Sequence, residues 1–219
     1  MAQRCRALVI IDAQNEFLSS DGNFPCPVES TQPFKKNLKA LIPKFRKAGG
    51  LIVWVKAFYE DRSEQPPQAR GTENSDEWLT TATHVFEKSC CKEGTEGSKI
   101  EKDLWGCADL VKDSFATKAF YSASAEKKEG AQDLQAVLKN KGVTDAYFCG
   151  VASNTCVLAT VLGAIEHKKE INPQLNVHVV EDCLGYRHKH KHDAALERMG
   201  KMQVESGLVL VKCDEIDWI

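Results

Sequence analysis

Three reactive side chains follow three of the apolar segments that we predict as strands. Asp12 ends the first segment, Lys112 follows the third, and Cys156 follows the fourth after the turn 150–155. A carboxylate can take the proton of a thiol, an ammonium group stabilises the resulting charge, and the thiolate can attack a carbonyl carbon. Cys156 also opens a predicted helix, whose N-terminal N–H groups favour a thiolate and can bind an oxyanion. These residue types predict acyl transfer through a thioester.

These three side chains can meet only if the apolar segments before them are parallel strands of one sheet. The segments are short and continuously apolar, as in strands that are buried on both faces. The carboxyl ends of parallel strands lie at one edge of a sheet, where ligands bind in open α/β folds. We therefore expect Asp12, Lys112 and Cys156 to converge there. The segments comprise residues 7–12, 51–55, 110–111, 146–149 and 177–180, with a last candidate at 208–211.

Helical patterns lie between the apolar segments. The first begins at Thr31 and stops at Gly49, and we expect Pro43 to kink or split it. The alternation of strands and helices predicts an α/β fold with three α-β-α layers and a doubly wound, mostly parallel sheet of about six strands. The other helices are predicted over 124–142, from 154 onward as an almost wholly apolar and buried helix, and over 192–202.

Several blocks of sequence follow the pattern of one known family. The most specific is GVASNTCVLAT at 150–160, which is similar to the family's G-V-x-x-x-x-C-V-x-x-T turn. Together the blocks resemble the isochorismatase-like cysteine hydrolases, which include nicotinamidases and N-carbamoylsarcosine amidases, and they cover nearly the whole chain. Two departures are Glu16 in place of a second Asp and Ser124 in place of Phe. The other blocks are DAQNEF at 12–17, CKEGTEG at 91–97, KDSFATKAFYSA at 112–123 and VEDCLGYR at 180–187.

The resemblance implies a role for each residue of a catalytic triad. Cys156 would be the nucleophile, Asp12 the general acid and base, and Lys112 the electrostatic partner. Lys118 is the competing assignment, because some members of the family keep a shorter spacing. We prefer Lys112 because it follows the strand-like residues 109–111.

The resemblance also implies the geometry of the backbone at the nucleophile. It predicts a cis peptide bond between Val151 and Ala152. This bond would aim the N–H groups of Ala152 and Cys156 at the substrate oxygen, so that they form the oxyanion hole.

A metal site of the family is missing from the sequence. Metal-dependent nicotinamidases carry Asp-x-His after the second strand and a further His before the Gly-Thr loop. Here the first motif reads Lys56-Ala57-Phe58, and the second position falls at Cys90 or Cys91. We therefore expect no catalytic metal and no other cofactor, and nicotinamidase activity is disfavoured.

Aromatic and basic side chains are candidates for the substrate pocket. Phe17, Phe58 and Trp78 could form its walls, since binding sites are largely apolar with few polar groups. Arg70 and Arg187 could bind an anionic substrate through two hydrogen bonds each. The alternating histidines and lysines at 188–192 could bind metal, phosphate or RNA, but a solvated loop before the next helix explains them better.

Length and composition exclude several classes of protein. The chain has 219 residues, 42% hydrophobic and 27% charged, which fits one globular domain over residues 1–219. The long polar segment 59–108 is expected to wrap over the sheet edge or cover a site. A net charge of −2 and no apolar run of roughly 20 residues argue against nucleic-acid and membrane partners. Nine cysteines, an odd number, fit reduced thiols in a cytoplasmic protein.

The sequence thus predicts a metal-independent hydrolase that cleaves a small amide, ureido or related carbon–heteroatom bond. Isochorismatase-type hydrolysis of a vinyl ether is a second reading, and a non-catalytic member that binds a small molecule or RNA is a third. Family members often form dimers or tetramers, so we expect a homo-oligomer.

Overall fold

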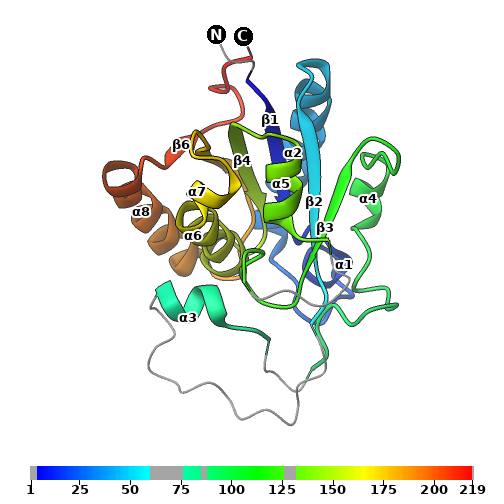
Figure 1. The fold of residues 1–219 in the computed structure, drawn as a ribbon. Helices are drawn as coiled ribbons and strands as arrows, with labels where there is room; N and C mark the ends of the chain where they lie inside the picture. Colours follow the sequence, from blue (N-terminus) through cyan, green and yellow to red (C-terminus); the bar gives the residue numbers. More distant parts are fainter. Residues whose placement is uncertain (1–3, 60–75, 85–87, 126–131, 219) are drawn as a thin grey trace.

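The computed structural model contains a six-stranded sheet in which every pair of neighbouring strands is parallel (Figure 1). It describes residues 4–59, 76–84, 88–125 and 132–218, with the backbone alone for 76–78. The strand order β3-β2-β1-β4-β5-β6 places β1 at the centre, so the chain winds outward in both directions. The strands are β1 (Arg6–Ile11), β2 (Leu51–Ala57), β3 (Ser114–Lys118), β4 (Asp145–Gly150), β5 (Asn176–Leu184) and β6 (Val209–Val211).

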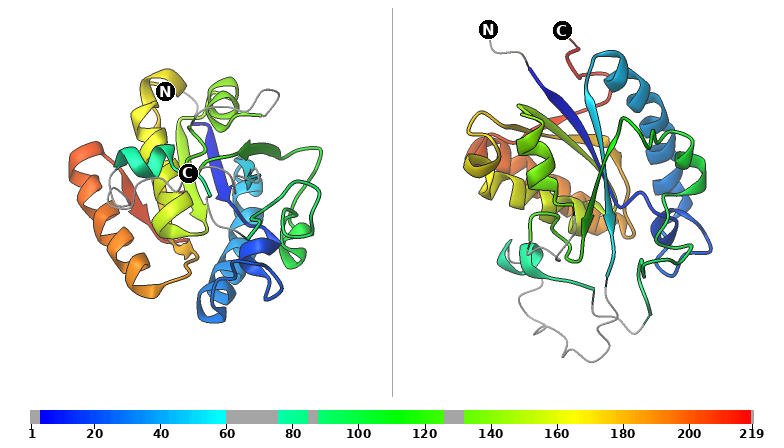
Figure 2. Two further views of the ribbon diagram at one scale, coloured as in Figure 1. Left: turned by 90° about the horizontal axis from the view of Figure 1, so that it is seen from below. Right: turned by 45° about the vertical axis from the view of Figure 1, so that its right-hand side comes forward.

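Helices cover both faces of the sheet, as expected for a doubly wound fold (Figure 2). Alternate residues of β1 point to opposite faces, so Val9 and Ile11 pack with one helical layer and Leu8 and Ile10 with the other. The described helices are α1 (Asn15–Leu18), α2 (Val28–Lys47), α3 (Asp76–Thr81), α4 (Lys102–Trp105), α5 (Leu134–Asn140), α6 (Leu158–Glu166), α7 (Lys168–Ile171) and α8 (Lys189–Ser206), with a π-helical turn at Ser153–Val157.

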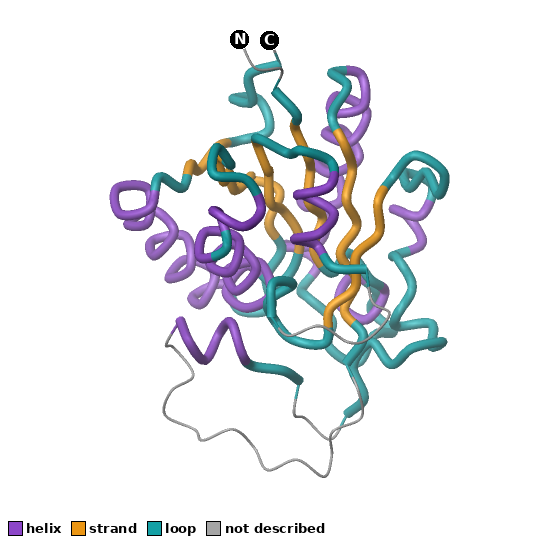
Figure 3. Tube along the Cα trace, in the orientation of Figure 1, coloured by secondary structure: helices purple, strands orange, loops and turns teal. Residues whose placement is uncertain are grey.

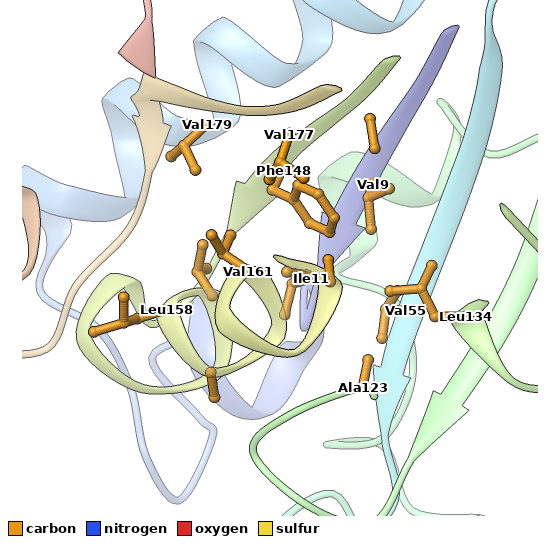
Figure 4. Close-up of a cluster of buried hydrophobic side chains, with 14 of the residues drawn as sticks. Val9, Ile11, Val55, Ala123, Leu134, Phe148, Leu158, Val161, Val177 and Val179 are labelled. Carbon is orange, nitrogen blue, oxygen red and sulfur yellow. The ribbon is translucent and has the colours of Figure 1, made fainter. Parts of the chain in front are cut away.

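The two faces of the sheet have separate apolar cores. One core joins the strands to α5, α6 and α8, and Figure 4 shows Val9, Ile11 and Phe148 of the sheet close to Val161 of α6. The other core joins the opposite face to α2, through side chains such as Phe34. Because β1 is buried on both faces along its whole length, the position of the residue that follows it is tightly fixed.

Helix α2 is not split at Pro43, where we had expected a kink or a break, but continues to Lys47. Proline removes one backbone N–H, and the carbonyl left without that donor belongs to Lys39. Both Pro43 and Lys39 are exposed, so water can bind this carbonyl at little cost. The helix ends before Gly49, which has a positive φ of 74°.

The third predicted strand is wrong in position. Leu110 and Val111 are 65% and 93% exposed and lie in a turn, while the strand begins at Ser114. Asp109 stabilises this turn, because its carboxylate accepts hydrogen bonds from the N–H groups of Val111 and Lys112 at 3.1 and 3.2 Å. Short side-chain acceptors of this kind compete with strand hydrogen bonds, so the apolar pair does not enter the sheet.

The other predicted elements are present in the structure, but they begin or end at different residues than we predicted. The predicted helix 124–142 is described as α5 over Leu134–Asn140, with 126–131 outside the described residues. The buried helix from 154 is confirmed, but it begins as a π-helical turn, and the last helix begins at Lys189 instead of 192. No helix in the described ranges is both long and apolar enough to cross a bilayer. Loops gather at the carboxyl ends of the strands (Figure 3).

Gly150 ends β4 before the turn that contains Cys156, at a point where a larger residue does not fit. Its φ is +128°, and a Cβ there would overlap the Ile11 carbonyl group. That carbonyl accepts a hydrogen bond from the Val151 N–H at 3.0 Å, so neither backbone segment can move away freely. The end of β4 is thereby held against the end of β1, close to Asp12.

The Gly150→Ala substitution should therefore lower the free energy of unfolding by about 3–5 kcal/mol, through overpacking and backbone strain together. Urea unfolding followed by circular dichroism would measure this loss. Gly207→Ala is the matched control, since Gly207 has φ +70° but open space around it, and should cost only about 1–2 kcal/mol. Equal losses in the two variants would contradict the close approach of β4 and β1.

Candidate active site

Asp12 lies directly beyond β1 and is completely buried. Its backbone has a positive φ of 53°, and its N–H donates to the Val55 carbonyl at 2.9 Å. One carboxylate oxygen, Oδ2, lies 2.9 Å from the ammonium nitrogen of Lys118. Burial raises the pKa of Asp12, although Lys118 and a hydrogen bond from Cys156 oppose the rise. Such a carboxyl group is suited to accept and return a proton.

Lys118, at the end of β3, is the lysine that meets Asp12. Its ammonium also donates to the Tyr59 hydroxyl and the Phe120 carbonyl, both at 3.1 Å, so two hydrogen bonds accompany the ion pair. Burial would lower the pKa of Lys118, but the interactions with Asp12 and Cys156 outweigh it and raise this pKa. Lys118 therefore stays positively charged.

Lys112, which we had preferred as the triad lysine, does not converge with Asp12. Its side chain is 79% exposed, and its ammonium pairs with Asp109 at 3.4 Å. The reason is the turn that displaces β3 toward the C-terminus, so that the strand ends at Lys118. The geometry therefore supports Lys118, the competing assignment, in place of Lys112.

Cys156 lies in the π-helical turn that follows β4. Cys156 is 5% exposed, its sulfur lies 3.4 Å from the Tyr59 hydroxyl, and the nearby Asp12 and Lys118 side chains shift the pKa of its thiol. The turn is fixed by the Ser153 N–H, which donates to the Gly185 carbonyl at 2.9 Å. The side chains of Asp12, Lys118 and Cys156 thus meet at the carboxyl edge of the sheet.

The Cys156 thiol is protonated at rest, in contrast to the thiolate that a helix N-terminus and a nearby ammonium led us to expect. Burial raises its pKa to about 12, and this effect exceeds the lowering by Lys118 and by the Tyr59 hydrogen bond. The carboxylate of Asp12 raises the pKa further. The arrangement therefore suits removal of the thiol proton by Asp12 during attack.

The expected backbone features of the turn are present. The Val151–Ala152 peptide bond is cis, which confirms the prediction. Among the residues that the structure describes, the Ala152 N–H donates to no hydrogen-bond acceptor. The oxyanion role of the Ala152 and Cys156 N–H groups stays a prediction.

Gln14 is a positioning residue that sequence reasoning did not identify. It is completely buried, and its amide donates to the carbonyls of Ala57 and Ser98 at 3.0 and 2.9 Å. Its carbonyl accepts from the Ala57 N–H at 2.8 Å. Gln14 therefore ties the ends of β1 and β2 to the loop before α4. The D-x-Q spacing of 12–14 was the available signal, because a buried amide needs several partners.

An aromatic cluster lies beside the triad, and only part of it was predicted. Phe17 packs on this cluster, whereas Phe58 is half-buried, with the Lys56 ammonium 4.9 Å from its ring centre. Of the other predicted pocket residues, Trp78 lies in α3 with its side chain outside the described part, and Arg70 lies outside it altogether. The cluster is formed by Phe24, Tyr59, Cys90 and Cys91 with Ala57, and Phe17 and Tyr121 pack against it.

The chain resembles known proteins in both sequence and fold. The sequence model of the family described as "Isochorismatase domain" matches residues 6–207. This chain belongs to the isochorismatase family. Ureidoacrylate amidohydrolase RutB of Enterobacter sp. (strain 638) is 27% identical over 161 residues, which is 71% of this chain and 66% of that protein, just under two thirds of its length.

Solved structures of isochorismatase-like hydrolases show the same fold. N-carbamoylsarcosine amidase from Thermoplasma acidophilum superposes with a TM-score of 0.67 at 19% identity, covering 97% of this chain and 99% of that one. Pyrazinamidase of Pyrococcus horikoshii, solved in complex with zinc, gives 0.65 at 24% identity, covering 94% and 98%. Because both identities are below 25%, these similarities show a shared fold and nothing about the activity of this chain.

The residues at the family's metal position do not fit a metal site. Lys56 carries a positive charge and lies over the Phe58 ring, so neither residue supplies a ligand. Cys90 and Cys91 are the remaining donors there, and both are buried in the aromatic cluster. In the described ranges, no group of three or more His, Cys, Asp or Glu side chains is arranged to hold a metal ion. Independence from metal stays a prediction.

The histidine and lysine run at 188–192 forms the start of α8, where we had expected a solvated loop. His192 is buried, and its Nδ1 lies 2.9 Å from the Ser153 hydroxyl in the nucleophile turn. Lys189 pairs with Asp193 one turn along the helix. At least His192 therefore belongs to the packing of the active-site turn.

The reactivity of Cys156 should depend on Lys118 and not on Lys112. With a thiol pKa of about 12, alkylation of Cys156 by iodoacetamide should rise about tenfold per pH unit between pH 7 and 9.5 without a plateau. Lys118→Met removes the charge that favours the thiolate and should slow alkylation at least about tenfold at each pH. Because all nine cysteines are free, mass spectrometry of the peptide that contains Cys156 is the measurement.

Lys112→Met is the matched control, and its Cys156 should react within about twofold of the wild-type rate. Circular dichroism should show both variants folded. A plateau near neutral pH, or equal effects of the two lysine substitutions, would contradict the site described above.

Proposed function

We propose that the protein hydrolyses a small ureido or amide C–N bond, without a metal, through Cys156, Asp12 and Lys118. The observation that carries the proposal is the proximity of three buried groups: Oδ2 of Asp12 lies 2.9 Å from Nζ of Lys118, and both groups are close enough to the Cys156 sulfur to shift the pKa of its thiol. A base, a permanent cation and a nucleophile are thus within reach of one substrate atom.

In the first half of the proposed reaction, the S–H bond of Cys156 breaks and its proton moves to Asp12. The sulfur electron pair forms a C–S bond with the substrate carbonyl carbon, and the π electrons move to the oxygen. The N–H groups of Ala152 and Cys156 bind that oxyanion. Collapse breaks the C–N bond, and Asp12 gives the proton to the departing nitrogen.

In the second half, water replaces the departed amine. Asp12 takes one proton from water, and the water oxygen attacks the thioester carbon. Collapse breaks the C–S bond, and the proton held by Asp12 returns to sulfur. Lys118 keeps its positive charge throughout. Whenever Asp12 is ionised, its buried negative charge is therefore paired with a cation.

A ureido substrate with a carboxylate is the class that the surroundings favour. RutB and the Thermoplasma enzyme are named for ureidoacrylate and N-carbamoylsarcosine, and both compounds carry a carbamoyl nitrogen and a carboxylate. Arg187 follows β5 at the same edge of the sheet, and its guanidinium carbon lies 5.3 Å from the Phe24 ring centre. Its positive charge acts on His84 and Tyr121, so it is placed to bind the anionic end of a substrate.

A panel of N-carbamoyl amino acids, ureidoacrylate and matched neutral ureas and amides would test this function. Product release should be fastest for the carboxylates, and Cys156→Ala should abolish it by at least about 10³-fold. Hydroxylamine should divert the product to the hydroxamate or hydroxyurea, because it attacks the thioester in place of water. This diversion reveals the intermediate even when it does not accumulate.

Two results would contradict the proposal. One is turnover of the panel by Cys156→Ala at the wild-type rate. The other is turnover without any hydroxylamine product, which would favour direct hydrolysis of the kind expected for a vinyl ether.

A further inference from the structure

Tyr59 lies outside the triad, yet its hydroxyl touches two of the triad's side chains. The oxygen is 3.4 Å from the Cys156 sulfur and accepts a hydrogen bond from the Lys118 ammonium at 3.1 Å. The residue follows β2, at the same edge of the sheet, and is 5% exposed. The hydroxyl therefore occupies the space between the nucleophile and the permanent cation.

The tyrosine ring is held in place independently of its hydroxyl. It stacks on His84 with a centroid distance of 5.5 Å and meets the edge of Tyr121 at 6.2 Å. It also packs in the aromatic cluster with Phe24 and the buried cysteines. These contacts position the oxygen without any help from Cys156, so the donor is preorganised for the sulfur.

The charges around the hydroxyl determine the direction of its hydrogen bond. The Lys118 ammonium can only donate, so the Tyr59 oxygen is the acceptor in that hydrogen bond and the phenol proton is available for a second partner. The Tyr59 proton is then left to point at sulfur. Burial and the nearby charges of Cys156 and Asp12 raise the pKa of Tyr59, so the phenol remains protonated.

We propose that Tyr59 is a further catalytic residue, whose hydroxyl donates a hydrogen bond to the Cys156 sulfur while that sulfur carries negative charge. The proposal rests on Cys156 being the nucleophile, as proposed above. As the thiol proton moves to Asp12, the sulfur gains negative charge and the Tyr59 hydrogen bond strengthens. The same donor stabilises sulfur again when the thioester collapses and sulfur departs. Tyr59 keeps its own proton in both steps.

If Tyr59 served only to fill space in the core, its hydroxyl group would not be needed. Phenylalanine would fill the same space and keep both ring contacts, whereas a buried hydroxyl must be satisfied by polar partners. The polar partners described for this oxygen are Lys118 and Cys156. The hydroxyl also lowers the pKa of Cys156, which acts against the effect of burial.

The Tyr59→Phe variant tests the proposal, because it removes only the donor. Alkylation of Cys156 by iodoacetamide at fixed pH should fall about 10- to 100-fold, since a hydrogen bond to a charged group is worth roughly this factor. With a substrate from the panel, kcat should fall by a similar factor while KM stays within about twofold. A smaller side chain opens the site, so a mere steric effect would speed alkylation.

Tyr147→Phe is the matched control, because Tyr147 is a buried tyrosine of β4 that stacks on His178. It should leave both rates within about twofold of wild type. If Tyr59→Phe does not fold, 3-fluorotyrosine at position 59 keeps the shape and makes the hydroxyl a stronger donor, and Cys156 alkylation should then accelerate.

Unchanged alkylation and kcat in a folded Tyr59→Phe variant would overturn the proposal for Tyr59. Loss of the hydroxylamine product in the wild type would instead overturn Cys156 as the nucleophile. The two failures are therefore distinguishable.

Discussion

The buried ion pair between Asp12 and Lys118 is the constraint on which the rest of the site depends. Both side chains are removed from water, with 0% and 1% of their surface exposed, so each charge requires the other. Such a pair requires two strand ends to lie within a fraction of an ångström of their best positions. The sheet provides this precision, because β1 is buried on both faces and Gln14 joins the ends of β1 and β2.

The same burial determines the chemistry available to Cys156. Desolvation disfavours the thiolate more strongly than Lys118 favours it, so the resting nucleophile is a neutral thiol beside a carboxylate. The positive charge of Lys118 favours the ionised form of that carboxyl group and opposes the larger rise in pKa that burial causes. In the proposed reaction, proton transfer from sulfur to Asp12 is therefore coupled to attack. A site of this kind keeps its thiol unreactive until a carbonyl group is bound.

Sequence reasoning predicted the fold and the positions of Asp12 and Cys156 at the carboxyl edge of the sheet, because each depends on a local pattern. Continuous apolar runs predicted five of the six strands, including the last candidate, which is β6, and the turn around Cys156 has a specific spacing. The lysine was misplaced because the strand before it was misplaced: Leu110 and Val111 look like strand residues, but Asp109 holds them in a turn. Tyr59 and Gln14 act through contacts between segments that are distant in sequence, which no local pattern reveals.

The most direct test of the account is a double-mutant cycle between Asp12→Asn and Lys118→Met, measured by urea unfolding at pH 7. Each single variant leaves one buried charge without its partner and should lose about 3–5 kcal/mol of unfolding free energy. The double variant removes both charges and should recover most of this loss, giving a coupling energy of at least about 2 kcal/mol. Losses that simply add in the double variant would contradict a buried Asp12–Lys118 pair as the centre of the site.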